Sequence, residues 1–93
     1  MDDTQEACHQ FRVRGHVQGV YYRAATRDEA IALGLRGWVE NRADGSVSVV
    51  VCGPEPAVET LREWLWSGPP AARVDSVEAE PVADPGSEGF AIV

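Results

Sequence analysis

The segment around Asp44-Gly45 leaves few alternatives to a β-hairpin. Residues 36–42 and 46–52 form two short runs of strand character, and Ala43-Asp44-Gly45 joins them. An Asp-Gly pair between two such runs is a strong hairpin signal, because glycine adopts the positive φ angles that a tight turn requires. The sequence therefore predicts two neighbouring antiparallel strands near the middle of the chain.

The residues before the hairpin predict a strand followed by a helix. In residues 7–14 the side chains alternate between a face that includes Phe11 and Val13 and a more polar face, as in a half-buried strand. Residues 22–33 carry apolar side chains at helical spacing and end before Gly34, which suits a left-handed helix cap.

The residues after the hairpin predict a second helix and two more strands. The prolines that follow Gly53 suit a helix start, and Gly68-Pro69-Pro70 ends that helix. Residues 74–82 alternate weakly as a fourth strand, and residues 90–92 indicate a short terminal one.

This order of elements predicts an α+β fold, the ferredoxin-like split β-α-β sandwich. Four main strands form an antiparallel sheet with the first and third at its centre, a short C-terminal strand is added, and both helices pack on one face. With 93 residues, 44% of them hydrophobic, the chain has the length of one domain. We expect a single domain over residues 1–93.

The charge of the chain disfavours nucleic acid and anionic membranes as partners. The formal net charge is -7, and the acidic residues are spread along the chain, so that any anion site must be local. The first ten residues lack the basic start and apolar run of a signal peptide, and no stretch approaches the ~20 apolar residues of a membrane helix. We expect a cytoplasmic protein.

The predicted topology brings distant residues to one site. Strands one and two run parallel on either side of strand three, so their C-terminal ends lie at the same end of the sheet. The loop Gly15-His16-Val17-Gln18-Gly19-Val20 leaves strand one, Arg23 lies in the first helical turn, and Asn41 ends strand two. Backbone N–H groups at a helix start and a guanidinium group favour a phosphate, whereas Asn41 suits orienting a water molecule. The G-x-x-x-G spacing alone is a weak signal for such a site.

Two longer motifs carry a specific resemblance. Gly15-His16-Val17-Gln18-Gly19-Val20-Tyr21-Tyr22-Arg23, and Gly37-Trp38-Val39-Glu40-Asn41 followed by Asp44-Gly45, closely resemble the two signatures of the acylphosphatase family. The resemblance runs over nearly the whole chain. It implies hydrolysis of the carboxyl-phosphate bond of a small-molecule acyl phosphate, which releases a carboxylate and inorganic phosphate. It implies no cofactor and no metal ion, and we expect a monomer.

The resemblance also implies a division of labour in the site. Arg23 and the loop residues Gly15, His16, Val17, Gln18, Gly19 and Val20 hold the phosphoryl group, and Asn41 holds the attacking water. No carboxylate pair or His-Asp couple accompanies the motifs, and an acyl phosphate has a good leaving group. Positioning and charge stabilisation therefore suffice, and the substrate's own phosphate takes up the proton of the water.

Four residues near the motifs have structural interpretations. Tyr22 stands where the family commonly has phenylalanine, and its ring fills the same core position if the hydroxyl group finds a partner. Glu40 stands where a basic residue is common, and strand alternation points it away from the face of Asn41. His16 is expected to be a solvated loop residue, and His9 an inward-facing strand residue with its hydrogen bonds satisfied rather than a metal ligand.

Cys8 and Cys52 are the two cysteines of the chain. Cys8 begins strand one and Cys52 ends antiparallel strand three, so the two residues are expected nearly opposite each other on matching faces. We therefore expect that they can form an intramolecular disulfide, although a reducing cytoplasm keeps such bonds open.

Three other functions share this fold. A non-catalytic module would use the same loop to bind a phosphorylated metabolite or to regulate a partner, and only an activity measurement separates it from an enzyme. An RNA-recognition motif needs exposed aromatic residues on its central strands, which residues 46–52 lack. An acylphosphatase-like domain of a larger carbamoyl-transfer maturation protein is the third alternative, and the short chain argues against it.

Overall fold

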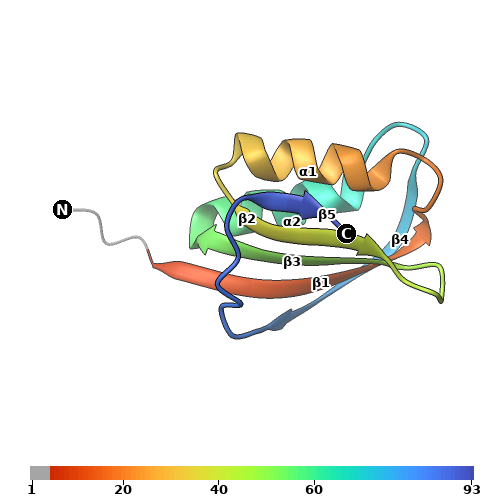
Figure 1. The fold of residues 1–93 in the computed structure, drawn as a ribbon. Coiled ribbons are helices and arrows are strands. Elements are labelled where there is room, and N and C mark those ends of the chain that lie inside the picture. The colour runs from red at the N-terminus through yellow and green to blue at the C-terminus, as the bar shows by residue number, and fades with distance from the viewer. Residues whose placement is uncertain (1–4) are drawn as a thin grey trace.

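The computed structural model describes residues 5–93; residues 1–4, which open the N-terminal segment considered above, lie outside the described residues. Two helices and five strands follow one another in the predicted order (Figure 1). Their bounds are β1 Glu6–His16, α1 Tyr22–Ala32, β2 Arg36–Asn41, β3 Val47–Pro54, α2 Glu55–Ser67, β4 Arg73–Pro81 and β5 Phe90–Ile92.

The five strands form one sheet in the order β4-β1-β3-β2-β5. β1 and β3 are therefore central, as the split β-α-β topology requires, and β1 pairs antiparallel with both β3 and β4. The terminal strand β5 pairs parallel with β2, so the sheet is antiparallel everywhere except at this edge. The predicted fold class is confirmed, and the C-terminal strand lies beside the strand that ends in Asn41.

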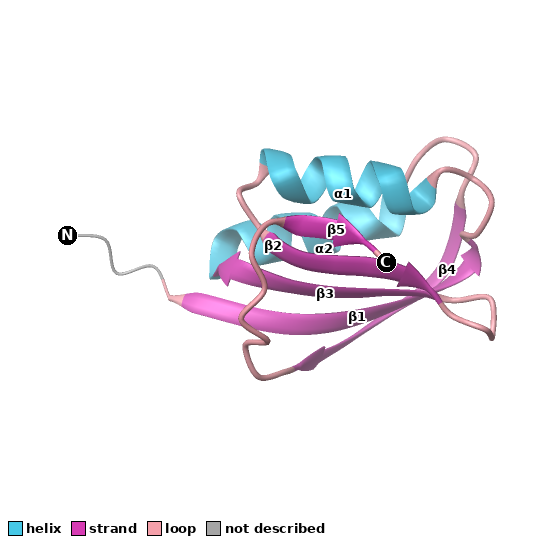
Figure 2. Cartoon of the chain, viewed as in Figure 1, coloured by secondary structure: helices cyan, strands magenta, loops and turns pink. Residues whose placement is uncertain are grey.

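Both helices cover the same face of the sheet (Figure 2). α1 packs over β2 and β5, whereas α2 packs over β1, β3 and β4. Between the helices and the sheet lies a core of apolar side chains with at most 1% of their surface exposed, which includes Phe11, Val13, Val39, Val49, Val51, Leu61 and Leu65. Neither helix within residues 5–93 is long and apolar enough to cross a membrane.

Local hydrogen bonds explain where α1 stops. Gly34 has φ 73°, the left-handed conformation that glycine adopts without steric cost. The N–H of Gly34 donates to the carbonyl of Ile31, and the N–H of Leu35 donates to that of Ala30. This pair of bonds is a Schellman motif, which satisfies two carbonyl groups at the end of the helix. The predicted left-handed cap at Gly34 is confirmed.

The hairpin between β2 and β3 is held by its aspartate. One carboxylate oxygen of Asp44 accepts hydrogen bonds from the backbone N–H of Ser46 at 3.0 Å and from the Ser46 hydroxyl at 2.6 Å. The N–H of Gly45, with φ 91°, donates to the carbonyl of Arg42. The predicted hairpin is therefore present, with Ser46 in the turn rather than in the strand.

The first strand continues further than predicted. We expected Gly15 and His16 in a loop, but both belong to β1 and pair with β4 after a register shift between Arg14 and Gly15. Gly15 has φ 136°, and a Cβ atom there would collide with the carbonyl oxygen of Arg73 on β4. The register shift leaves Asp75 of β4 as the extra, unpaired residue, and this β-bulge lets the strand pairing continue past a break in the hydrophobic pattern. The connection to α1 is correspondingly short.

His9 lies on the inward face, as predicted, and stacks against Phe11 with 5.9 Å between ring centroids. The prediction that its hydrogen bonds are satisfied is wrong, because the Nδ1 atom is buried and has no hydrogen-bond partner within residues 5–93. Its strand neighbours offer apolar side chains, Val51 on β3 and Pro81 on β4. Strand alternation therefore predicts correctly that the His9 ring faces inward, but it does not predict whether a hydrogen-bond partner lies beside the ring.

Candidate active site

Arg23 and Asn41, 18 positions apart in the sequence, line the same cavity. Its volume is about 180 Å³, and it lies between the turn that enters α1 and the ends of β2 and β5. The residues that line this cavity, called here the α1 cavity, are Val17, Gly19, Tyr21, Tyr22, Arg23, Ala24, Asn41 and Ile92. The fold brings the two residues together because β1 and β2 run in the same direction on either side of β3.

Arg23 is distinguished from the other arginines by its lack of an ion pair. The chain has eight arginines, and seven of them lie within 4.0 Å of a carboxylate oxygen. Within residues 5–93, the guanidinium group of Arg23 has neither an ion pair nor a hydrogen bond. Its second position in α1 adds the partial positive charge of the helix N-terminus. A positive charge without a counterion in a cavity is suited to bind an anion.

Asn41 is exposed at the last position of β2. Its side-chain amide has no hydrogen-bond partner within the described residues, so both its oxygen and its nitrogen are available to a water molecule or a ligand. The neighbouring carboxylate of Glu40 accepts a 3.2 Å hydrogen bond from Arg42. Glu40 is therefore engaged on the opposite face of the strand, as alternation predicted.

The residues expected to form the phosphate loop divide into three groups. Val17 and Gly19 line the α1 cavity together with Arg23. Gly15 lines a separate hollow of about 200 Å³ beside Asp44 and the hairpin. His16, Gln18 and Val20 line neither cavity, and His16 is exposed at the end of β1.

Gln18 has a structural role that the sequence did not reveal. Its side-chain amide nitrogen donates to the carbonyl oxygen of Arg42 at 2.8 Å and to that of Ser46 at 2.9 Å. These bonds fasten the turn before α1 to the hairpin that follows Asn41. The two parts of the candidate site are thereby held at a fixed separation, although no local pattern signals a bond across 24 residues.

Four residues that line the α1 cavity were not among the predicted site residues: Tyr21, Tyr22, Ala24 and Ile92. Ile92 reaches it because β5 lies beside β2, and the backbone N–H of Val93 continues this pairing by donating to Val39. Tyr21 precedes α1 in a left-handed conformation, with φ 68° and ψ 16°. The available signal for Tyr21 was its position two residues before the motif arginine, Arg23, whereas the sequence did not indicate which strand β5 would join.

Tyr22 anchors the residues on either side of it. The side chain is 1% exposed, and its hydroxyl donates a 2.6 Å hydrogen bond to the backbone carbonyl of Leu65 in α2. Burial of the phenol raises its pKa above the ordinary value. The expectation that the Tyr22 hydroxyl finds a partner is confirmed, and this bond fixes the first turn of α1, which carries Arg23, to the second helix.

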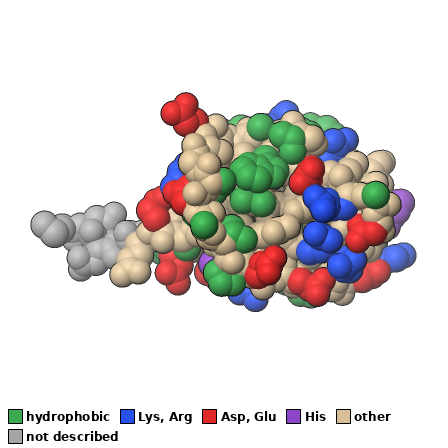
Figure 3. Space-filling model, turned by 60° about the horizontal axis from the view of Figure 1, so that its bottom comes forward, with side chains coloured by type: hydrophobic (Ala, Val, Ile, Leu, Met, Phe, Trp, Pro, Cys, Tyr) green, Lys and Arg blue, Asp and Glu red, His purple; other side chains and the backbone are tan. Residues whose placement is uncertain are grey.

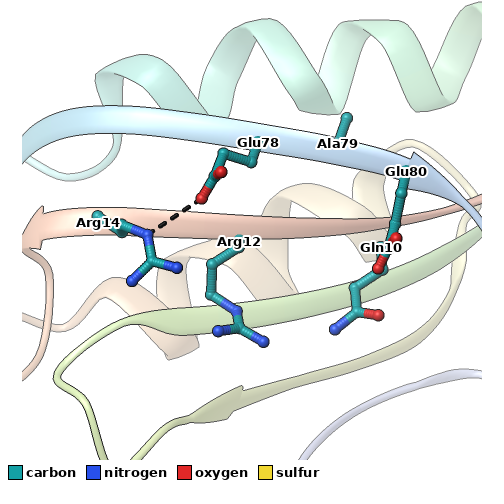
Figure 4. A pocket seen from close by; sticks show the side chains of 6 residues that line it. All are labelled: Gln10, Arg12, Arg14, Glu78, Ala79 and Glu80. Carbon is teal, nitrogen blue, oxygen red and sulfur yellow. Dashed lines mark hydrogen bonds and ion pairs between the residues drawn. The ribbon is translucent and has the colours of Figure 1, made fainter.

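A larger cavity, of about 320 Å³, lies on the face of the sheet that the helices leave open (Figure 4). It contains two arginines, and both have carboxylate partners: Arg14 contacts Glu78 at 3.0 Å and Asp44 at 3.2 Å, and Arg12 contacts Asp44 at 3.7 Å. The hydrogen bonds to Glu78 and Asp44 raise the pKa of Arg14. Basic and acidic side chains are likewise mixed on the face that Figure 3 shows. This cavity therefore offers less free positive charge than the α1 cavity.

Cys8 and Cys52 lie opposite each other in the β1–β3 register and are joined by a disulfide, with their Cα atoms 4.2 Å apart. Together with Asp84 they are the one group of three potential metal ligands within residues 5–93, but sulfur atoms bonded to each other are not available as thiolates. The pair lies near the start of β1, whereas the candidate site follows its end. The disulfide is therefore remote from Arg23.

Comparisons with known proteins agree on one family. The acylphosphatase family model matches residues 9–92. The chain is 49% identical over 92 residues to an acylphosphatase of Halorhodospira halophila, with 99% of both chains covered. It resembles the structure of an acylphosphatase from Coxiella burnetii with a TM-score of 0.92 and 38% identity over the full length of both. It also resembles part of full-length HypF, with a TM-score of 0.90 and 26% identity over 99% of this chain and 12% of that one.

Proposed function

The chain belongs to the acylphosphatase family and hydrolyses acyl phosphates, and from this premise we propose that Arg23 and Asn41 carry the reaction in the α1 cavity. The main support for the proposal is that Arg23 has no ion pair within residues 5–93. Of the eight arginines it alone lacks a carboxylate partner within residues 5–93, and it shares a cavity with an amide side chain that is equally free.

The phosphoryl group binds to the guanidinium group of Arg23 and to backbone N–H groups of the turn that contains Val17 and Gly19. A guanidinium donates two parallel hydrogen bonds to phosphate oxygens, and the start of α1 favours negative charge at the same place. Gln18 supports this arrangement indirectly, because it fixes the turn to the hairpin. His16 and Val20 lie outside the cavity and act only through the conformation of the loop.

Asn41 orients the attacking water. An amide is not a base, so it accepts one hydrogen bond from the water and leaves the oxygen lone pair directed at phosphorus. The water oxygen forms a bond to phosphorus while the bond from phosphorus to the acyl oxygen breaks, and the carboxylate leaves with the electron pair. The proton of the water passes to a phosphate oxygen, and the products are a carboxylate and inorganic phosphate.

No metal ion enters this scheme, because Arg23 and the loop amides supply the charge stabilisation that the equatorial oxygens need in a loose transition state. We also propose that the protein acts as a monomeric cytoplasmic domain over residues 1–93 that binds neither nucleic acid nor membranes. The net charge of -7 and the pairing of seven of the eight arginines support the expectation that the protein binds neither nucleic acid nor anionic membranes.

The test is hydrolysis of benzoyl phosphate in excess EDTA, with a phosphate monoester as the negative control. We expect turnover of benzoyl phosphate that EDTA does not reduce, and none of the monoester. Strict dependence on added metal would contradict the proposed mechanism. A protein that binds phosphate but turns over no acyl phosphate would be a binding module of the same fold.

A further inference from the structure

Tyr21 adopts a backbone conformation that tyrosine normally avoids. Among residues 5–93 it is the one non-glycine residue with positive φ, at φ 68° and ψ 16°. Glycine, asparagine and aspartate adopt this left-handed conformation far more readily than an aromatic residue does, because the side chain crowds the following carbonyl oxygen. Strain of this kind persists where the surroundings enforce it, and it concentrates at functional sites.

The side chain of Tyr21 gains nothing from the rest of the molecule that would explain the strain. It is 68% exposed, and its hydroxyl group has no hydrogen-bond partner within residues 5–93. Its neighbour Tyr22 is the opposite case, since it is 1% exposed and bonded to Leu65. Tyr21 does line the α1 cavity, together with Arg23.

The geometry of phosphoryl transfer indicates what lies against Tyr21. The attacking and leaving oxygens lie roughly in line through phosphorus. In the proposed mechanism the water is held by Asn41, on the wall of the cavity that β2 and β5 form. The leaving acyl group must then extend away from Asn41, and Tyr21 is the large exposed side chain among the cavity residues outside β2 and β5.

We propose that Tyr21 is the acyl-group contact of the enzyme, and that its ring makes the enzyme favour acyl phosphates with an aromatic or extended apolar acyl group over acetyl phosphate. This inference rests on the proposed function. Because the Tyr21 side chain lines the cavity and is 68% exposed, its ring is available to stack on an acyl group. Tyr21 thus determines specificity, whereas Arg23 and Asn41 act on the phosphoryl group common to all substrates.

The experiment compares kcat/KM for benzoyl phosphate and for acetyl phosphate in the wild type and three variants. Tyr21→Asn removes the ring and keeps a residue that tolerates the left-handed conformation. Tyr21→Phe keeps the ring. Trp66→Ala is the matched control, because Trp66 is an exposed aromatic residue, 51% exposed, that does not line the α1 cavity.

We expect Tyr21→Asn to lower the ratio of benzoyl to acetyl kcat/KM by roughly three- to tenfold, the range of a single aromatic contact. Tyr21→Phe and Trp66→Ala should retain the wild-type ratio. An unchanged ratio in Tyr21→Asn, or an equal loss on both substrates, would overturn the assignment of Tyr21 and leave the proposed function intact. Absence of hydrolysis by the wild-type protein would instead refute the proposed function.

Discussion

The hydroxyl group of Tyr22 occupies the place of a missing backbone donor at the end of α2. The carbonyl oxygen of Leu65 would normally accept from the N–H four residues on, but position 69 is proline and has no N–H. Tyr22 donates to that carbonyl at 2.6 Å from the first turn of α1. One side chain thus satisfies a buried acceptor and fixes the turn that presents Arg23.

Tyr22→Phe should destabilise the protein by about 1–3 kcal/mol, because it leaves the buried Leu65 carbonyl without a partner. The free energy of unfolding from urea denaturation measures this. Tyr21→Phe is the matched control, since it removes an exposed hydroxyl with no partner within residues 5–93, and it should change stability by less than about 0.5 kcal/mol. Equal stability of both variants would mean that the bond across the helices contributes nothing.

Arg23→Gln should lower kcat for benzoyl phosphate by at least about a hundredfold, a barrier increase of about 2.7 kcal/mol. Because Arg23 has no ion pair within the described part of the chain, the substitution should leave stability nearly unchanged. Arg27→Gln is the control, since Arg27 lies on the same helix but is engaged with Asp28 and does not line the cavity. Near-normal turnover by folded Arg23→Gln would refute the proposed site.

Asn41→Ala should also lower kcat by at least about a hundredfold, since the attacking water loses its orientation. KM should change much less than in Arg23→Gln, because the phosphoryl group keeps its binding partners. The neighbouring exposed variant Arg42→Ala, which removes only the bond to Glu40, should retain most activity. A rise in KM with unchanged kcat would show that Asn41 binds the ground state instead.

Reduction of the Cys8–Cys52 disulfide should lower stability by up to about 4 kcal/mol, the entropic estimate for a link between residues 44 apart. Activity under native conditions should stay near the wild-type level, because the link lies near the start of β1 and the site follows its end. Unfolding curves with and without reductant measure the effect. Two free thiols in the air-oxidised monomer, detected by mass spectrometry, would refute the link.

Acid should remove the contribution of Asp44 to stability. Hydrogen bonds from the hydroxyl and N–H of Ser46, together with Arg14, lower the pKa of Asp44 from 3.8 to about 2. A lowered folded-state pKa means that the stabilisation is complete above the unfolded-state pKa and is lost as pH falls through the folded-state pKa. The stability difference between wild type and Asp44→Asn should therefore be constant above about pH 5 and decline progressively as pH falls from about 5 to about 1. A difference as large at about pH 1 as at about pH 6 would contradict this.

Much of the fold followed from patterns that span a few residues. The Asp44-Gly45 turn, the cap at Gly34 and the alternation in β1 depend on backbone preferences of neighbouring residues, and each appears in the structure near its predicted position. The one clear exception is the end of β1. Gly15 and His16 stay in the strand because β4, some 60 residues later, supplies a partner across a bulge.

The candidate site was foreseen less completely. The topology explained why Arg23 and Asn41 meet, and the motifs drew attention to both residues. Tyr21 and Ile92 were missed, because one depends on a strained backbone angle and the other on the strand that β5 joins. The loop was expected to act as a unit, whereas Gln18 bonds to the hairpin and Gly15 lines a different hollow.

The sequence by itself determined the order of the helices and strands, the turn residues and the family, because these depend on the periodicity and chemistry of residues close together in the chain. The tertiary structure decided which polar groups find partners. It gave seven arginines a carboxylate and left Arg23 without one within residues 5–93, and it brought the hydroxyl of Tyr22 to a carbonyl 43 residues away. Such pairings depend on how separate elements pack, and no local pattern encodes them.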